Sequence, residues 1–203
     1  MKNYDVIWKR KSCRLFEDKG VKEEDIKEIV RAGQQAPSPK NIQPWRFMVI
    51  KDQEEKKKIS ETLKRAIKNL QTDYTRKGEK RQDLSLALES AEIIEKAPII
   101  IFVYMNTDGM KYHDDGVKWH LYAKDVECNY IMSVGAAIEN MLLAATEMGL
   151  DSLWMGDIFY AHHELQSLFN EEGILMAAIA LGYGIDKSEK KSRMTLEQVL
   201  SWT

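Results

Sequence analysis

The second half of the chain contains a helical pattern that is apolar on almost every side. Between residues 126 and 148, apolar and small residues recur at helical spacing: Ile131, Val134, Ala137, Ile138, Met141, Leu142 and Ala145. A surface helix needs a single apolar stripe, so a helix with this pattern must be covered by protein on most of its sides. We predict a central helix over residues 126–148, ended by Gly149, with the rest of the chain packed around it.

Strand-like and helical segments alternate along the remaining sequence. Residues 46–51, 98–105 and 174–181 are apolar runs of strand length, and residues 153–155 form a shorter one. Amphipathic helices are predicted over residues 22–35 and around Ile59, Leu63, Ile67 and Leu70. Such alternation predicts an α/β or an α+β fold. A chain of 203 residues fits one domain, over residues 1–203.

Two further segments are exposed or in need of a partner. Residues 71–83 are so charged that we predict an exposed loop or helix end there. The C-terminal segment carries an apolar stripe made of Leu196, Val199, Leu200 and Trp202. Because a short tail can bury such a stripe only against another surface, we expect a partner subunit to cover it.

Charge and cysteine usage exclude several classes of protein. Lys and Arg number 30 against 32 Asp and Glu, a formal net charge of -2, so the cationic excess that drives non-specific nucleic-acid binding is missing. The first residues are charged, and no run reaches the length of a membrane span. Cys13 and Cys128 lack the spacing of a disulfide framework or a zinc site. We expect a cytoplasmic protein without nucleic-acid or membrane partners.

The first candidate site lies near the N-terminus. Arg10, Ser12 and Arg14 alternate by two, which could place two guanidinium groups and a hydroxyl around one phosphate. Lys11 adds a cation within the same motif. The alternative is that these cations only interact with the dipole of a helix, or are simply solvated.

The second candidate is the polar segment that follows the helix over residues 22–35. Two prolines fix its backbone and three side chains can donate and accept hydrogen bonds: Pro37, Ser38, Pro39, Asn41 and Gln43. A rigid polar loop of this kind suits the edge of a planar ligand. The same residue types also make an ordinary turn between a helix and a strand.

Four motifs, taken in order, resemble the nitroreductase family. They are an R-x-S-x-R opening from Arg10, an A-P-S-x-x-N-x-Q-P-W segment from Ala36, a small-residue central helix followed by G-L-x-x-x-W-x-G from Gly149, and a basic pair, Lys191 and Arg193. The similarity extends from about residue 3 to the C-terminus and is weakest over residues 70–95 and 106–125.

The resemblance implies a fold, a cofactor and an assembly. The fold would be α+β, with three α/β/α layers, a mainly antiparallel central sheet and a C-terminal tail that is swapped between the subunits of a homodimer. The cofactor would be FMN, with two flavins at the subunit interface. Residues that match the terminal motifs would bind its phosphate and ribityl chain: Arg10, Lys11, Ser12, Arg14, Lys191 and Arg193.

The resemblance also assigns residues to the flavin ring. Pro37, Ser38, Pro39 and Asn41 would border it from the other subunit, with Gln43 in the same loop. The backbone amides of Met155 and Gly156 would approach N5, the atom that takes and gives the hydride. Ser133 stands where relatives often carry a longer polar residue such as Gln, which leaves its flavin contact open.

The implied activity is an FMN-dependent, ping-pong hydride transfer from NADH or NADPH to nitroaromatic, quinone or similar electron-poor acceptors. Solvent can supply protons, so we assign no catalytic side chain. Two activities of the superfamily fit the same motifs, a benzimidazole synthase-like cleavage of flavin and a reductive dehalogenation. A non-catalytic flavin-binding redox sensor is the alternative from another class of protein.

Other residue combinations point to no further chemistry. Gly182-Tyr183-Gly184 lacks the third glycine of a Rossmann nucleotide site. The spacing of His113, Asp114, Asp115 and His120 is not that of a metal site, so no metal is expected. Trp119 is a candidate for a substrate pocket, and His162-His163 should begin or precede a helix.

Overall fold

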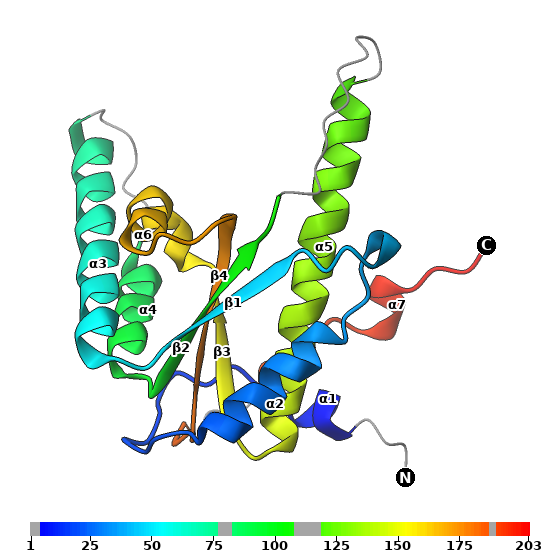
Figure 1. The fold of residues 1–203 in the computed structure, drawn as a ribbon, viewed down its shortest axis with the longest axis horizontal. Helices are drawn as coiled ribbons and strands as arrows, with labels where there is room; N and C mark the ends of the chain where they lie inside the picture. Colours follow the sequence, from blue (N-terminus) through cyan, green and yellow to red (C-terminus); the bar gives the residue numbers. More distant parts are fainter. Residues whose placement is uncertain (1–4, 77–82, 108–118, 187–189) are drawn as a thin grey trace.

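A four-stranded antiparallel sheet forms the middle of the molecule (Figure 1). The computed structural model describes residues 5–76, 83–107, 119–186 and 190–203. The strands are β1 (Trp45–Ile50), β2 (Ile99–Met105), β3 (Asp151–Met155) and β4 (Ile174–Gly182), in the order β1-β2-β4-β3. Each strand begins and ends within two residues of a predicted one, so the apolar runs located them correctly.

Helices cover both faces of the sheet and make three α/β/α layers (Figure 1). One face carries α3 (Gln53–Arg76), α4 (Ser85–Lys96), the short 3₁₀ helix η2 (Asp157–Ala161) and α6 (His162–Leu168), which begins at His162 as predicted. The other face carries α2 (Glu23–Gln34) and α5 (Trp119–Glu147). This is the α+β arrangement that the resemblance implies.

Strand β2 shows why both faces are covered. Ile100, Phe102 and Tyr104 belong to the core on the α3 side, whereas Ile99, Ile101, Val103 and Met105 belong to the core on the α5 side. Successive side chains of a strand point to opposite faces, so an unbroken apolar run requires cover on both.

Helix α5 is the predicted central helix, although it begins at Trp119 and not near residue 126. Its buried side packs against the sheet and α2, where Gly33 lies so close to Met141 that a Cβ would come within 2.8 Å of the Met141 Cγ. Ile131 and Met132 on the other side are exposed. The expected cover on almost every side is therefore incomplete within one chain.

Helix α4 is absent from the sequence-based prediction. Its buried face includes Ala87, Ala91 and Ile94, and it packs against α3. Alanines give a weak apolar signal, which explains why the sequence does not reveal the helix. The buried Lys56 of α3 donates from Nζ to the Ala97 carbonyl at 2.6 Å, and burial lowers its pKa.

The charged segment and the tail agree with their predictions only in part. Helix α3 continues to Arg76, so residues 71–76 are a helix end, while residues 77–82 lie outside the described part of the chain. The tail contains the short helix α7 (Leu196–Val199), capped by Thr195 and Gln198. Its apolar side chains are exposed, Trp202 by 87%. Among the described helices, none has the length and hydropathy needed to cross a bilayer.

Candidate functional site

Cations from the two ends of the chain meet in one hollow, which we call the basic pocket. Its volume is about 330 Å³, and seven residues line it: Lys11, Ser12, Arg14, Asp186, Lys190, Lys191 and Arg193. Five of them are cations and one is an acid. Residues nearly 180 positions apart in sequence thus form a single cationic hollow, which suits a small anion such as a phosphate.

The N-terminal half of the basic pocket is held by the sheet. Cys13 is buried, and its backbone N–H donates to the carbonyl of Ser152 in β3 at 2.9 Å. Neighbouring side chains of an extended segment point to opposite sides, so the inward Cys13 turns Ser12 and Arg14 outward. Burial raises the pKa of the Cys13 thiol, which makes it a packing residue and a poor nucleophile.

Arg10 and Lys11 are fixed differently. Arg10 Nε lies 3.5 Å from Glu139 Oε1 of α5, and its side chain is only 16% exposed. Arg10 follows α1 (Asp5–Lys9) and does not line the basic pocket. Lys11 lines it and donates from Nζ to the backbone carbonyl of Asp186 at 2.7 Å. Arg10 is therefore not part of the basic pocket, and its contact with the flavin remains a prediction.

The C-terminal half of the basic pocket comes from residues 190–193. Lys191 and Arg193, both predicted, line the hollow, and the Arg193 guanidinium donates to the Lys191 carbonyl at 3.2 Å. Sequence reasoning missed Lys190 and Asp186, which line it too. The sequence signal that could have included Lys190 in the site is its positive charge directly before the basic pair.

The loop over residues 37–43 is the second part of the site, and its backbone is strained. Lys40, Asn41 and Gln43 have φ values of 51°, 58° and 53°, in the left-handed region that residues other than glycine avoid. The loop contains the 3₁₀ helix η1 (Pro39–Asn41). Three such residues in one exposed loop point to a functional constraint on its shape.

Two hydrogen bonds within the loop support this strained shape. Ser38 Oγ accepts from the backbone N–H of Gln43 at 2.9 Å, and the Gln43 side-chain amide donates to the Asn41 carbonyl at 3.4 Å. Pro37 and Pro39 fix φ on either side of Ser38. No residue of the loop lines the basic pocket of its own chain. The structure thus keeps the two predicted halves of the site apart within one chain.

Strand β3 leads from the basic pocket to the predicted contacts with the flavin ring. Ser152 pairs with Ser12, and Met155 ends the strand about 10 Å further along. Met155 is buried, whereas Gly156 is exposed, with φ -95° and open space where a Cβ would lie among the described residues. The fold itself therefore does not require glycine at position 156.

Ser133 lies on the buried side of α5. Its hydroxyl donates to the Asn129 carbonyl one turn earlier in the same helix, at 2.7 Å. It does not line the basic pocket. Its flavin contact, left open by the sequence, remains a prediction.

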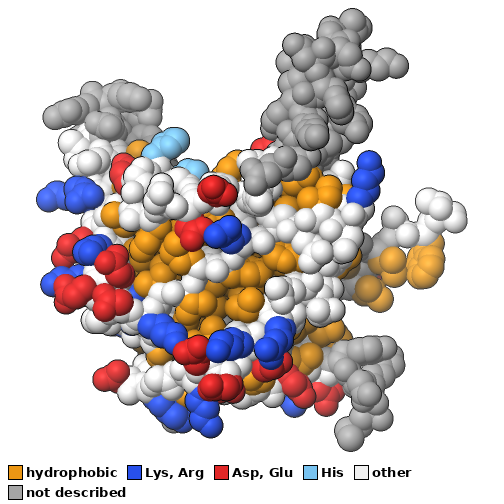
Figure 2. All heavy atoms as spheres, viewed as in Figure 1, with side chains coloured by type: hydrophobic (Ala, Val, Ile, Leu, Met, Phe, Trp, Pro, Cys, Tyr) orange, Lys and Arg blue, Asp and Glu red, His pale blue; other side chains and the backbone are white. Residues whose placement is uncertain are grey.

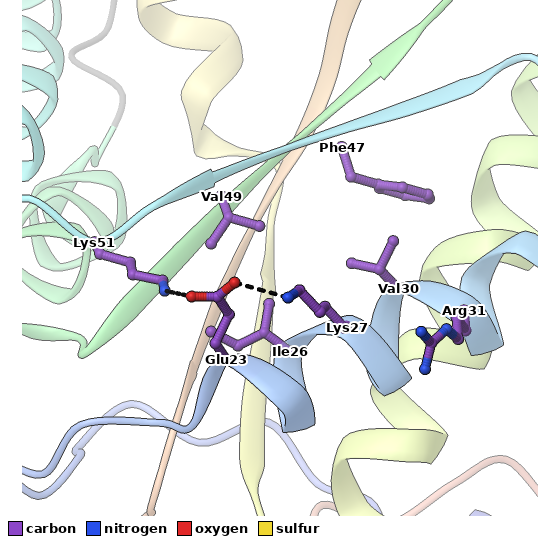
Figure 3. A pocket seen from close by; sticks show the side chains of 8 residues that line it. All are labelled: Glu23, Ile26, Lys27, Val30, Arg31, Phe47, Val49 and Lys51. Atoms are coloured by element: carbon purple, nitrogen blue, oxygen red, sulfur yellow. Dashed lines mark ion pairs between the residues drawn. The ribbon is translucent and has the colours of Figure 1, made fainter.

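A second hollow lies between α2 and the edge strand β1 (Figure 3). Its volume is about 470 Å³; its floor includes Ile26, Val30 and Phe47, and Glu23 at its rim pairs with Lys27 and Lys51. Figure 2 shows apolar side chains gathered in the middle of this face with charged side chains around them. None of the predicted site residues lines the hollow, so we do not assign the cofactor to it.

The described residues contain no group of three or more His, Cys, Asp or Glu side chains that could hold a metal ion. His113, Asp114 and Asp115 lie outside the described part of the chain. Trp119 and His120 begin α5. The candidate site therefore consists of the basic pocket, the loop over residues 37–43 and the end of β3.

Comparison with known sequences agrees with these motifs. The model of the Nitroreductase family matches residues 7–183. A protein of Archaeoglobus fulgidus named "Putative NADH dehydrogenase/NAD(P)H nitroreductase" is 26% identical over 91% of this chain and 86% of its own length. An "Iodotyrosine deiodinase" of Thermotoga neapolitana is 25% identical over 94% of this chain and 92% of its own length.

Comparison with solved structures gives the same fold. A BluB-like flavoprotein of Clostridium difficile superposes with a TM-score of 0.81 and 27% identity, covering 100% of this chain and 99% of its own. A structure described as a putative nitroreductase in complex with FMN, from Desulfovibrio desulfuricans, gives a TM-score of 0.71 and 25% identity, covering 100% and 97%. Since the family model spans most of the chain and the fold agrees, the chain belongs to the nitroreductase family.

Proposed function

We propose that this protein is an FMN-dependent oxidoreductase that uses NADH or NADPH to reduce an electron-poor small molecule such as a nitroaromatic or a quinone. The observation that carries the proposal is the basic pocket, where Arg14 and Arg193 from opposite ends of a nitroreductase-family chain line one hollow. The FMN bound by the Desulfovibrio relative supports FMN over other anions.

The residues of the basic pocket fit the phosphate of FMN. A phosphate monoester carries close to two negative charges at neutral pH and offers several acceptor oxygens. Arg14 and Arg193 offer guanidinium groups, which pair with phosphate through two parallel hydrogen bonds, and Ser12 offers a hydroxyl. Asp186 is the one acid among the lining residues, so the hollow is cationic overall.

The flavin ring would lie at the far end of β3. The strand separates the Ser12–Ser152 contact from Met155 by about 10 Å, which leaves room for a ribityl chain. The exposed backbone of Gly156, with no Cβ beside it, would admit the ring edge. There the backbone amides of Met155 and Gly156 would donate toward the reactive nitrogen.

The loop over residues 37–43 would complete the flavin site of a second copy. It is strained, exposed and absent from the basic pocket of its own chain. Apolar side chains that one chain leaves exposed, among them Trp8, Met132 and Trp202, favour a homodimer with a swapped tail. This assembly would also cover the exposed side of α5.

The chain's own residues would bind and orient, with no side chain acting as a proton donor. FMN, when bound, would supply the redox chemistry, a ping-pong hydride transfer between NAD(P)H and the acceptor. The residues of the basic pocket would anchor the phosphate end of FMN, and the backbone of Gly156 would orient its ring. Cys13 and Cys128 are free thiols, which suits a cytoplasmic location.

Two neighbouring activities form the second candidate. The likeness to a BluB-like flavoprotein supports a benzimidazole synthase-like cleavage of the flavin itself. The iodotyrosine deiodinase relative supports reductive dehalogenation of a halogenated phenol. Loss of the flavin spectrum in air after reduction would favour the first, and halide release the second.

Anaerobic reduction of the purified protein tests the proposed function. We expect a yellow protein that bleaches with NADH or NADPH and regains its colour with nitrofurazone or menadione. A protein that stays colourless and takes up no added FMN would refute it. Light scattering at micromolar concentration should give the mass of a dimer, and a monomeric mass with FMN bound would contradict the shared site.

A further inference from the structure

Lys190 holds the basic tail against the N-terminal helix. Its Nζ donates to the backbone carbonyl of Trp8 at 2.9 Å and to that of Ile7 at 3.2 Å. Both carbonyls belong to the last turn of α1, where a helix leaves its final carbonyls without intrahelical partners. The ammonium therefore satisfies two backbone acceptors more than 180 positions away in sequence.

Within one chain, these two hydrogen bonds attach the tail to α1. They join residue 190 to residues 7 and 8 and so connect the two ends of the chain. Other hydrogen bonds of the tail are internal, such as that from Arg193 to the Lys191 carbonyl. Loss of the Lys190 ammonium would therefore remove two contacts that fix residues 191–193 beside Arg14 within one chain.

We propose that Lys190 is a positioning residue for the phosphate of the cofactor: it fastens the tail to α1, and this brings Lys191 and Arg193 into the basic pocket opposite Lys11 and Arg14. The inference rests on the proposed function, since the phosphate is that of FMN. It assigns Lys190 a role distinct from that of the two cations that follow it, although all three line the pocket.

The test compares Lys190→Met, which keeps the apolar stem and removes the donor, with Lys190→Arg, which keeps charge and donors. Lys68→Met, at an exposed position of α3, is the matched control. We expect Lys190→Met to weaken FMN binding about tenfold, the effect of losing hydrogen bonds to a charged group, while leaving riboflavin binding unchanged. Lys190→Arg and Lys68→Met should bind FMN as the wild type does.

A second readout separates positioning from direct contact with phosphate. The endoprotease Glu-C should cut the tail of cofactor-free Lys190→Met after Glu197 several-fold faster than in the wild type, because the attachment is lost whether or not FMN is present, and neither substitution adds a site for this protease. Weaker FMN binding with unchanged cleavage would mean that Lys190 contacts the phosphate directly, which overturns the positioning role. Unchanged FMN binding by Lys190→Met would overturn it as well.

The two proposals can fail separately. If the wild type binds no FMN, the proposed function fails, and cleavage of the cofactor-free variants still tests the attachment. In that case, equal cleavage of Lys190→Met and wild type would overturn the attachment too.

Discussion

The two ends of the candidate flavin site differ in how much of the site one chain completes. At the phosphate end, residues from both termini line one hollow, held by hydrogen bonds from Cys13 to Ser152 and from Lys190 to α1. At the ring end, the loop over residues 37–43 adopts a strained backbone that its own basic pocket does not use. The difference suggests that the phosphate site forms within each chain, whereas the ring site needs two.

The largest effect should come from removing both arginines of the phosphate end. The double variant Arg14→Gln/Arg193→Gln should lose about 100-fold or more in FMN affinity, because in the proposed site each guanidinium would make charge-assisted hydrogen bonds to the phosphate. Riboflavin lacks the phosphate, so its affinity should not change. Fluorescence titration with both ligands measures the two effects.

Arg65→Gln, at an exposed position of α3, is the control and should bind FMN like the wild type. Equal losses for riboflavin and FMN in the double variant would show that the pocket supports the fold and does not hold the phosphate.

Gly156→Ala should disturb the ring end alone. The new Cβ meets open space among the described residues, so the free energy of unfolding should stay within about 0.5 kcal/mol of the wild type or rise slightly. If the flavin edge lies against this backbone, the methyl group should weaken FMN and riboflavin equally, by about tenfold. Denaturant unfolding and flavin titration check the two parts. Normal affinity for both ligands would remove Gly156 from the site.

Lys40→Gly tests whether the strain of the loop is real. Glycine adopts the φ of 51° without a steric penalty, so the cofactor-free protein should gain about 0.5–1 kcal/mol in unfolding free energy despite the entropy that glycine adds to the unfolded chain. Lys68→Gly, within α3, should lose about 1 kcal/mol. Denaturant unfolding of both variants supplies the comparison, and a loss at position 40 as large as that at position 68 would mean that the loop stores no strain.

The smallest effect should come from Asp186, the acid in the basic pocket. Asp186→Asn removes one negative charge near the phosphate, so FMN affinity should rise about threefold at low salt, and less at high salt because exposed charges are screened. Riboflavin affinity should stay constant. Weaker FMN binding by Asp186→Asn would indicate that Asp186 orders Lys11 or its neighbours and does not oppose the phosphate.

The sequence predicts the layers better than the contacts between distant segments. Apolar runs located β1, β2, β3 and β4, because β-branched and aromatic residues mark buried strands. Helix α4 was not predicted because its buried face contains small residues such as Ala87 and Ala91, and the sequence around them is rich in glutamate. Periodicity detects large apolar side chains and overlooks alanines.

The site shows the same division. The motifs indicated which residue types bind an anion, but only the fold shows that Arg14 and Arg193 share a hollow while Arg10 turns to Glu139. The positive φ of Lys40 and Gln43 has no signal in the sequence, since neither residue is a glycine. Local pattern predicts chemistry, whereas long-range packing decides which groups meet.

The most direct test of the central claim measures how strongly the wild-type protein prefers FMN to riboflavin, at low and at high salt. If the basic pocket holds the phosphate, FMN should bind at least about 100-fold more tightly at low salt, and added salt should reduce only the affinity for FMN. Equal affinities for the two flavins at every salt concentration would contradict the account, because the cations from the two ends of the chain would then have no phosphate to bind.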